Sequence, residues 1–386
     1  MLGLDRNLWL LFILNMAVGF SNQLIGPLFP LYLESLHASE LEIGLVISVA
    51  SIAATAFMLP SGLLIDRLGK RRMLLASVVL SAVPLISMAS VRDWLTVTPL
   101  YLIFSVAFSF FIPSRMAMIA ETATPQNRAT LFGLMNMAWP ISGIIAPTLS
   151  GFIAESYGWT LPFQISGGIM VISLLPTLLL RERKDVGFVL EGKTKGSLRD
   201  PMYFRFMVLF FAFHLAMTTG QGCVNTILPL FLKNQMGLST SLIGLFFTGS
   251  NVLTLITQIP SGWLADRYGR KKLIIACIAP IPFLYGVWPF IDNWIVLLIL
   301  NSVALGLWSM TWPATLALLS DFVPSDLRGS AFGVRMTGVR LGFTIGPFIS
   351  GYLYSSIGVM TPFIASAVSY LLGIMLAIFL KEKSHK

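Results

Sequence analysis

The chain has 386 residues, of which 56% are hydrophobic and only 11% are charged, and its formal net charge is +9. A water-soluble domain has roughly 25% charged residues, so this composition excludes an ordinary soluble protein. Apolar runs of about 20 residues recur along the chain, and each is long enough to cross a bilayer. Because backbone groups in lipid must bond internally, and because these runs are too long for barrel strands, we predict an all-α membrane protein.

Charged or Gly/Pro-rich breaks divide the chain into about twelve predicted transmembrane helices. They cover residues 8–35, 42–65, 73–91, 95–121, 129–155, 160–180, 203–233, 241–265, 273–291, 294–320, 329–355 and 360–380. The first run lacks a short apolar core followed by a small-residue cleavage site, so we interpret it as a retained span. An even number of spans places both termini on one side of the membrane.

Lysine and arginine are concentrated in one set of the loops between these spans. The set holds Arg67, Lys70, Arg71, Arg72, Arg128, Arg267, Arg270, Lys271, Lys272 and Arg328, whereas the opposite loops contain only Arg92 and Lys233. Cytoplasmic loops retain positive charge, so we predict a multi-pass protein of the cell membrane with both termini in the cytoplasm. Because the basic residues lie between apolar runs, they do not indicate a nucleic-acid partner.

The chain repeats itself at an interval of 200 residues. Residues 60–72 (PSGLLIDRLGKRR) return as residues 260–272 (PSGWLADRYGRKK), and similar pairs recur over nearly a whole half. We therefore predict an N-terminal six-helix bundle over 1–180, a cytoplasmic linker over 181–202 and a C-terminal six-helix bundle over 203–386. Six spans in each half give the halves the same orientation, as in transporters with parallel repeats.

The repeated loop carries a specific pattern of glycine and charge. It reads Gly62-x3-Asp66-Arg67-x-Gly69-Lys70-Arg71-Arg72 in the first half and Gly262-x3-Asp266-Arg267-x-Gly269-Arg270-Lys271-Lys272 in the second. With these two copies the chain resembles the major facilitator superfamily over essentially its full length. The resemblance implies two parallel, pseudo-symmetric six-helix bundles, transport by alternating access and a functional monomer.

The resemblance and the pseudo-symmetry also predict a gate at the basic loops. A carboxylate at the C-terminal end of its own helix is disfavoured by the helix dipole, and it becomes favourable at the N-terminus of another helix. Asp66 is expected to cap the eleventh span and Asp266 the fifth, with Arg335 reinforcing Asp66. The predicted gate set is Gly62, Asp66, Arg67, Gly69, Arg71, Glu121, Arg128, Gly262, Asp266, Arg267, Gly269, Lys271, Asp321, Arg328 and Arg335.

Polar and aromatic stripes on four spans predict the solute cavity. In the family that the chain resembles, spans 1, 4, 7 and 10 line the cavity, and an aromatic lining with a few polar groups is typical of small-molecule pockets. The candidates are Asn15, Asn22, Tyr101, Arg115, His214, Gln221, Asn225, Asn301, Trp308, Trp312 and Arg340. Arg340 lies near the middle of its span and is the best single candidate for contact with an anionic group, because a mid-membrane arginine usually faces a cavity or a partner.

The predicted function is secondary transport of a small organic solute, with export of amphipathic or aromatic compounds as the first hypothesis. The alternatives are transport of organic anions through Arg340, with Arg115 as a second candidate, or a facilitator without proton coupling. No Asp or Glu lies mid-span, so the coupling ion, H+ or Na+, is not assigned. With no HExxH, no GxSxG and no paired midplane carboxylates, we expect neither an enzyme nor a cofactor or metal. The expected partners are the solute and the lipid bilayer.

The gate hypothesis yields a first prediction. Asp66→Asn removes the charge that should hold the basic loop at the start of the eleventh span. Cysteine-accessibility labelling should therefore show a shift toward inward-facing conformers. Unchanged labelling would mean that no such gate exists.

Overall fold

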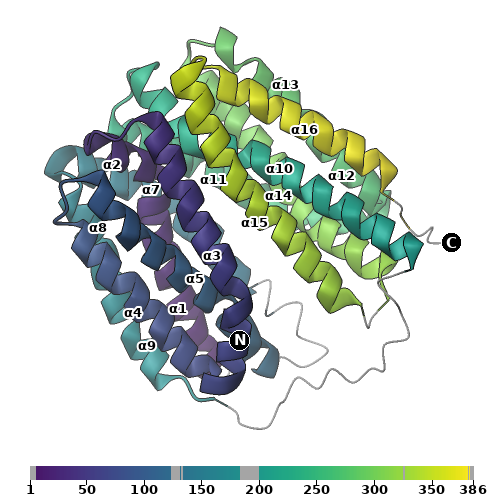
Figure 1. Cartoon of the computed structure of the whole chain (residues 1–386), viewed down its shortest axis with the longest axis horizontal. Helices are drawn as coiled ribbons and strands as arrows, with labels where there is room; N and C mark the ends of the chain where they lie inside the picture. Colours follow the sequence, from purple (N-terminus) through teal and green to yellow (C-terminus); the bar gives the residue numbers. More distant parts are fainter. Residues whose placement is uncertain are drawn as a thin grey trace. The chain divides into compact units, whose positions relative to one another are not determined.

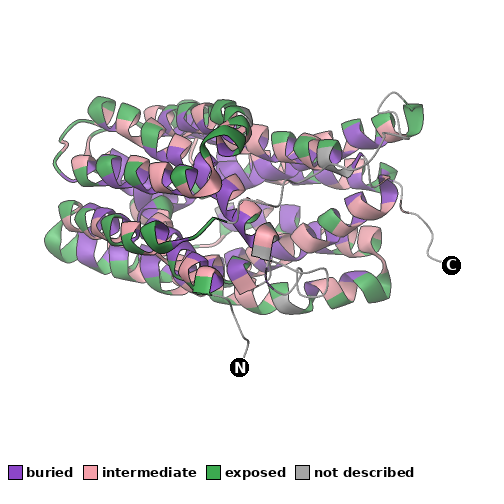
Figure 2. Ribbon diagram, turned by 90° about the horizontal axis from the view of Figure 1, so that it is seen from below, coloured by how far each residue is buried: buried purple, intermediate pink, exposed green. Residues whose placement is uncertain are grey.

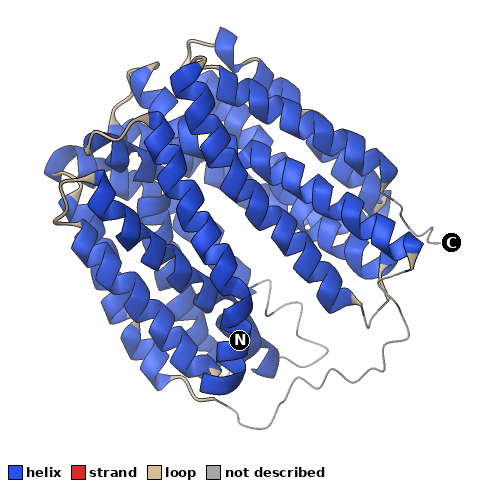
Figure 3. Cartoon of the chain, in the orientation of Figure 1, coloured by secondary structure: helices blue, strands red, loops and turns tan. Residues whose placement is uncertain are grey.

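In the computed structural model, the described residues are 6–122, 131, 134–182, 200–324, 327–380 and 382, and within these ranges every regular element is a helix (Figures 1 and 3). Most of the predicted 181–202 linker lies outside them, as does Arg128, a predicted gate residue. The long helices confirm the all-α prediction, and the absence of strands among the described residues agrees with it.

The first half of the chain forms helices that match the predicted spans to within a few residues at most ends. They are α1 Arg6–Ile25, η1 Gly26–Leu28, α2 Phe29–Ser35, α3 Glu40–Leu68, α4 Lys70–Met88, α5 Trp94–Thr122, α7 Ala138–Tyr157, α8 Thr160–Ile172 and α9 Leu174–Leu179. The predicted span 8–35 is interrupted at Gly26-Pro27, because proline lacks the N–H that continues an α-helix.

The second half follows the same order. Its helices are α10 Pro201–Asn234, α11 Thr240–Tyr268, α12 Arg270–Ile278, α13 Ile281–Gly286, η2 Trp288–Phe290, α14 Trp294–Phe322, α15 Arg328–Ser356 and α16 Thr361–Phe379. The predicted span 273–291 is divided between α12, α13 and η2, and Pro280 stands at the break.

Ten segments of the described chain are long and apolar enough to cross a membrane, two fewer than the predicted twelve. One missing span is 273–291, where no single helix is long enough. The other is α15, which has 29 residues but contains arginines and several glycines that lower its hydropathy. A helix packed against other helices tolerates such residues, so length and composition alone undercount the spans.

Contacts divide the chain into two compact units. Unit 1 consists of Met1–Ala38, Val49–Val189 and Gly237–Thr248, and unit 2 of Ser39–Ser48, Leu190–Met236 and Gly249–Lys386. These units follow the two sequence repeats, except that the first turns of α3 are grouped with unit 2 and those of α11 with unit 1. The boundaries predicted from sequence therefore stay a prediction.

The outer faces of the helices are strongly apolar. Figure 2 shows buried residues on the inner faces of the helices and exposed residues on the outer faces, and many exposed residues are large and hydrophobic, such as Ile172 and Leu175 at 66% and 64% exposure. In water such surfaces mark binding sites or aggregation, but in a membrane protein they are the surface that contacts lipid.

Helices α10 and α15 are in close contact through glycines of α15. A Cβ atom at Gly346 would lie 2.5 Å from the Thr219 carbonyl oxygen and 2.9 Å from the Cys223 nitrogen, and one at Gly338 would lie 2.7 Å from the Phe211 oxygen. All three neighbours are backbone atoms, which cannot rotate away. The small-residue stripe predicted on this span thus lets two backbones approach, as in other membrane helix pairs.

This packing predicts a specific loss of stability. Gly346→Ala should lower the melting temperature, because overpacking costs about 1–3 kcal/mol and the backbone of α10 cannot give way. Gly333→Ala is the matched control, since it lies on the same helix and a Cβ there meets nothing within 4 Å. The measurement is thermal unfolding in detergent, and equal melting temperatures for the two variants would contradict the account.

Candidate functional site

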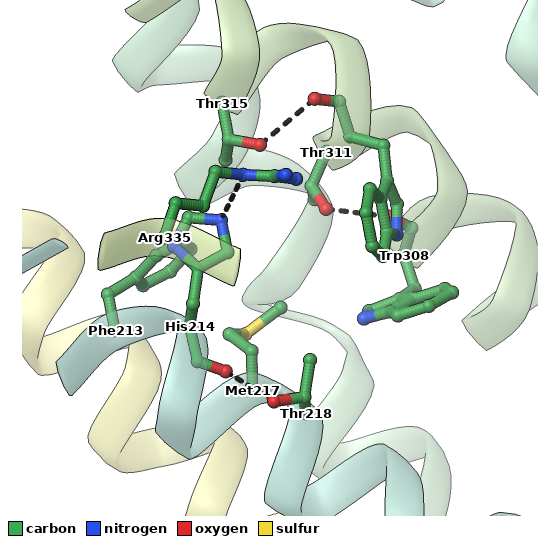
Figure 4. A pocket seen from close by; sticks show the side chains of 9 residues that line it. Phe213, His214, Met217, Thr218, Trp308, Thr311, Thr315 and Arg335 are labelled. Atoms are coloured by element: carbon green, nitrogen blue, oxygen red, sulfur yellow. Dashed lines mark hydrogen bonds between the residues drawn. The ribbon is translucent and has the colours of Figure 1, made fainter. Parts of the chain in front are cut away.

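A small pocket in unit 2 lies among α10, α14 and α15. It is lined by Phe213, His214, Met217, Thr218, Trp308, Thr311, Trp312, Thr315 and Arg335. Figure 4 shows the side chains of Arg335 and His214 next to each other, with Met217 and Thr218 nearby. The cavity itself is small, about 10 Å³, which is about the space that one water molecule needs, and it is partly open.

Arg335 is the charged group of this pocket. Its side chain is buried, with 3% of the residue exposed. The Nε–H group donates to His214 Nε2 at 3.1 Å, and Cζ lies 4.7 Å from the centroid of the Trp312 ring. Within the described residues no carboxylate forms an ion pair with it. The guanidinium is therefore held by an imidazole and an aromatic face, with no opposite charge beside it.

The two hydrogen bonds of His214 define its protonation. Arginine only donates, so Nε2 accepts from Arg335, and a carbonyl oxygen only accepts, so Nδ1 donates to the Phe210 oxygen at 2.9 Å. The neutral tautomer with its proton on Nδ1 is the one that satisfies both contacts. His214 is thus a buried neutral base directly beside a buried cation.

Aromatic rings form the rest of the wall. The rings of Trp308 and Trp312 pack edge to face, with centroids 5.4 Å apart, and Phe213 lies edge to face against His214 at 4.9 Å. Such surfaces attract planar apolar groups, and a cation over an aromatic face adds an electrostatic attraction. The pocket therefore combines an aromatic wall with one positive group.

Unit 1 contains a second buried arginine. Arg115 on α5 donates through Nη1 to Asn15 Oδ1 at 2.6 Å and through Nη2 to Asn136 Oδ1 at 3.4 Å, while its Nε has no partner in the described chain. Asn15 also donates to the Met135 carbonyl. Two predicted cavity residues, Asn15 and Arg115, are thus brought into contact. Like Arg335, Arg115 has no carboxylate partner among the described residues, although a buried charge is ordinarily paired.

The other predicted cavity residues occupy different places. Gln221 donates to Asn225 at 2.8 Å and accepts from the Tyr370 hydroxyl at 2.7 Å, away from the pocket lining. Asn301 donates to Ser250 at 2.9 Å and is buried. Asn22 donates to Val18 of its own helix, and Tyr101 stacks on Phe29 with ring centroids 3.9 Å apart. Their predicted role in the solute cavity stays a prediction.

Of the predicted cavity residues, His214, Trp308 and Trp312 line the pocket, whereas Arg340 does not. Arg340 is half-buried, and its side chain forms no hydrogen bond or ion pair within the described chain. Arg335, a predicted gate residue, lines this pocket, and its role in the gate stays a prediction. Helical spacing would have found Met217, three residues after His214, and Thr311, three residues after Trp308, whereas Phe213 directly precedes His214 and does not follow that spacing.

Each copy of the repeated basic loop is held within its own unit by two carboxylates. In unit 1 the Lys70 side chain pairs with Glu121, and the Lys70 amide donates to Glu182 at 2.6 Å. In unit 2 the Arg270 side chain pairs with Asp321, and its amide donates to Glu382 at 2.7 Å. Lys271 Nζ donates to the Ile378 oxygen at 2.6 Å, and Arg71 donates to the Leu178 oxygen. Both copies thus have the same arrangement.

Glu182 and Glu382 were not among the predicted gate residues. Each follows the last helix of its half and caps the first turn of α4 or α12, where free amides and the helix dipole favour a negative group. The signal was present, because the charge order of residues 181–183 (RER) returns at 381–383 (KEK). Gly69 and Gly269 form the preceding turns at φ of 90° and 93°, a conformation that favours glycine.

The remaining gate residues are partly described. Asp66 and Arg67 are exposed, Asp266 lies 3.7 Å from Arg270, and Arg267 lies 5.0 Å from the centroid of the Trp263 ring. The side chain of Arg328 lies outside the described part of the structure, as does Arg128. The predicted capping of the eleventh and fifth spans by Asp66 and Asp266 stays a prediction.

Comparison with known proteins gives consistent matches over the whole chain. The family model described as Major Facilitator Superfamily matches residues 11–220 and 206–386. Multidrug resistance protein 1 of Bacillus subtilis (strain 168) is 25% identical, over 97% of this chain and 95% of its own length. The cis,cis-muconate transport protein of Acinetobacter baylyi is 21% identical, over 83% and 80%. The crystal structure of D-xylose-proton symporter has a TM-score of 0.78 at 17% identity, over 97% of this chain and 96% of that one.

The capping carboxylates predict a measurable contribution to stability. Glu382→Ala should destabilise the protein by about 0.5–2 kcal/mol, because the Arg270 amide loses its acceptor at the start of α12. Glu382→Gln is the control, since its carbonyl oxygen can still accept, and it should lose less. Chemical denaturation in detergent is the measurement. A glutamine variant as unstable as the alanine variant would contradict a capping role.

Proposed function

Because the chain belongs to the major facilitator superfamily of membrane transporters, we propose that it exports amphipathic or aromatic organic compounds by alternating access. The observation that carries this proposal is the pocket in unit 2, in which Trp308, Trp312 and Phe213 form an aromatic wall. Apolar and aromatic walls with few polar groups are typical of sites that bind small organic molecules.

The relatives support export as the direction of transport. The relative from Bacillus subtilis is named a multidrug resistance protein, and it matches almost the whole length of this chain. Multidrug resistance by a transporter requires outward movement of varied compounds. Wide aromatic surfaces that contact many solutes through their faces suit such varied substrates, because stacking depends little on substituents.

Transport of organic anions is the second candidate. It is favoured by the two buried arginines, Arg115 and Arg335, neither of which is paired with a carboxylate among the described residues. A relative from Acinetobacter baylyi is named a cis,cis-muconate transport protein, and muconate is a dicarboxylate. Arg340, which the sequence predicts to contact an anionic group, is tested by measuring the transport of neutral and of anionic solutes by the Arg340→Ala variant.

We further propose that both termini lie in the cytoplasm and that the protein functions as a monomer. The orientation is supported by the lysines and arginines gathered in one set of loops, which cytoplasmic loops retain. A reporter protein that is active only in the cytoplasm should therefore be active when it is fused to either end of the chain. Tags that place residues 66–72 and 266–272 on different faces of the membrane would contradict both this orientation and the parallel repeat.

The aromatic wall predicts a selective loss of transport. Trp308→Ala should weaken binding and slow export of a fluorescent aromatic dye about tenfold, because loss of an aromatic contact costs roughly 0.5–1.5 kcal/mol besides the lost buried area. Trp9→Ala is the matched control, since Trp9 is 51% exposed and lies outside the pocket. Dye efflux from cells lacking other exporters is the measurement, and equal export by the two variants would refute the proposal.

A further inference from the structure

The pocket of unit 2 holds a cation that lacks a counter-ion. Arg335 is 97% buried, and the acceptors its side chain meets are His214 Nε2 at 3.1 Å and the sulfur of Met336 at 3.6 Å, which is a weak acceptor. No carboxylate in the described part of the chain lies within ion-pair distance of it. A buried charge is ordinarily paired, and where the protein provides no partner a ligand can.

We infer that this pocket binds the acid group of an aromatic anion at Arg335 and takes up one proton at His214 together with it. The inference rests on the proposed function, because it assigns a solute class and a protonation linked to binding to the same pocket.

The geometry around Arg335 suits an aromatic acid. A guanidinium is a planar fork of donors that matches the two oxygens of a carboxylate or sulfonate. Its Nε is occupied by His214, and Nη2 donates to none of the described residues. Trp312 lies under the guanidinium, and Trp308 and Phe213 continue the wall, so an aromatic ring attached to the acid group meets aromatic faces.

The hydrogen bond between Arg335 and His214 links the anion to a proton. While Nε2 of His214 accepts from Arg335, a second proton on the imidazole would place two N–H groups and two positive charges against each other. A bound anion neutralises Arg335 and offers an acceptor for the new N–H group. Proton uptake at Nε2 is then favoured, and by thermodynamic reciprocity the proton favours the anion equally.

The surroundings of His214 contribute no competing charge. From α15 the group that faces it is Arg335, and α16 contains no Asp, Glu, Lys, Arg or His. The nearest titratable group that α16 supplies to α10 is the Tyr370 hydroxyl, which donates to Gln221 two turns away. On α10 the neighbouring Phe210 and Phe213 are neutral, and the pocket residues of α14 are tryptophans and threonines. Among the described residues, Arg335 is therefore the charge that controls protonation of His214.

The test uses the full-length protein in lipid nanodiscs and 1-naphthalenesulfonate, an aromatic acid that stays anionic from about pH 6 to pH 8. Calorimetry should show that its affinity rises as the pH falls, by up to tenfold per pH unit for one linked proton. Titrations in buffers of different ionisation heat should show net proton uptake on binding. His214→Gln, which keeps an acceptor for Arg335 but does not titrate, should bind the sulfonate with a flat pH dependence.

Arg335→Gln should weaken sulfonate binding at least tenfold, and melting temperatures should confirm that each variant is folded. The inference is overturned if the unmodified protein does not bind the sulfonate, or if its affinity does not change with pH. It is also overturned if His214→Gln keeps the pH dependence, or if Arg340→Gln rather than Arg335→Gln abolishes binding. If the unmodified protein does not export a neutral aromatic dye, the proposed export function is contradicted. Binding of the sulfonate is measured separately and is unaffected by that result.

Discussion

The close contact between α10 and α15 is the constraint on which the pocket depends. Gly338 lies three residues after Arg335 on α15, and a Cβ atom there would meet the Phe211 oxygen at 2.7 Å and the His214 Cβ at 3.5 Å. Because this position has no side chain, the two backbones come close enough for Arg335 to reach across to His214. A larger residue would separate the helices, and Arg335 would then be moved away from the His214 nitrogen that accepts its hydrogen bond. In a membrane, where lipid is as apolar as leucine, such backbone proximity is a main source of helix association.

The two halves use the same helix position for different chemistry. Asn15 on α1 and His214 on α10 are counterparts, 199 residues apart, and each accepts a hydrogen bond from a buried arginine within its own unit. The arginine comes from α5 in unit 1 and from α15 in unit 2, so the pairing is repeated while the residue that supplies the charge is not. Asparagine cannot change its charge, whereas histidine can, and this makes the second half the one with a titratable partner. The two halves therefore place an arginine beside the same helix position, although the arginines come from helices that are not counterparts.

The basic loops show the opposite tendency, since there the contacts are repeated closely. Lys70 and Arg270 each have a carboxylate on the side chain and another on the amide, supplied by the end of α5 or α14 and by the residue that follows the last helix of the same half. The glutamates at 182 and 382 join the end of each bundle to the start of its third predicted span. This arrangement holds each loop within its own unit. The turns next to Asp66 and Asp266 are therefore held in place whatever other contacts these two residues make.

The sequence by itself determined the helical fold, the positions of nearly all the helices and the duplication, because the length of apolar runs and a repeated motif are properties of the chain alone. It also identified His214, Trp308 and Trp312, since residues at helical spacing share a face whatever lies opposite. The tertiary structure decided which face meets which. It placed Arg335, a predicted gate residue, beside His214 in the pocket of unit 2, and Arg340, the candidate near the middle of its span, does not line that pocket. Depth in the bilayer can be counted along one helix, but the direction in which a side chain points depends on how a neighbouring helix packs, and here that is decided by glycines whose effect appears only when α10 lies against them.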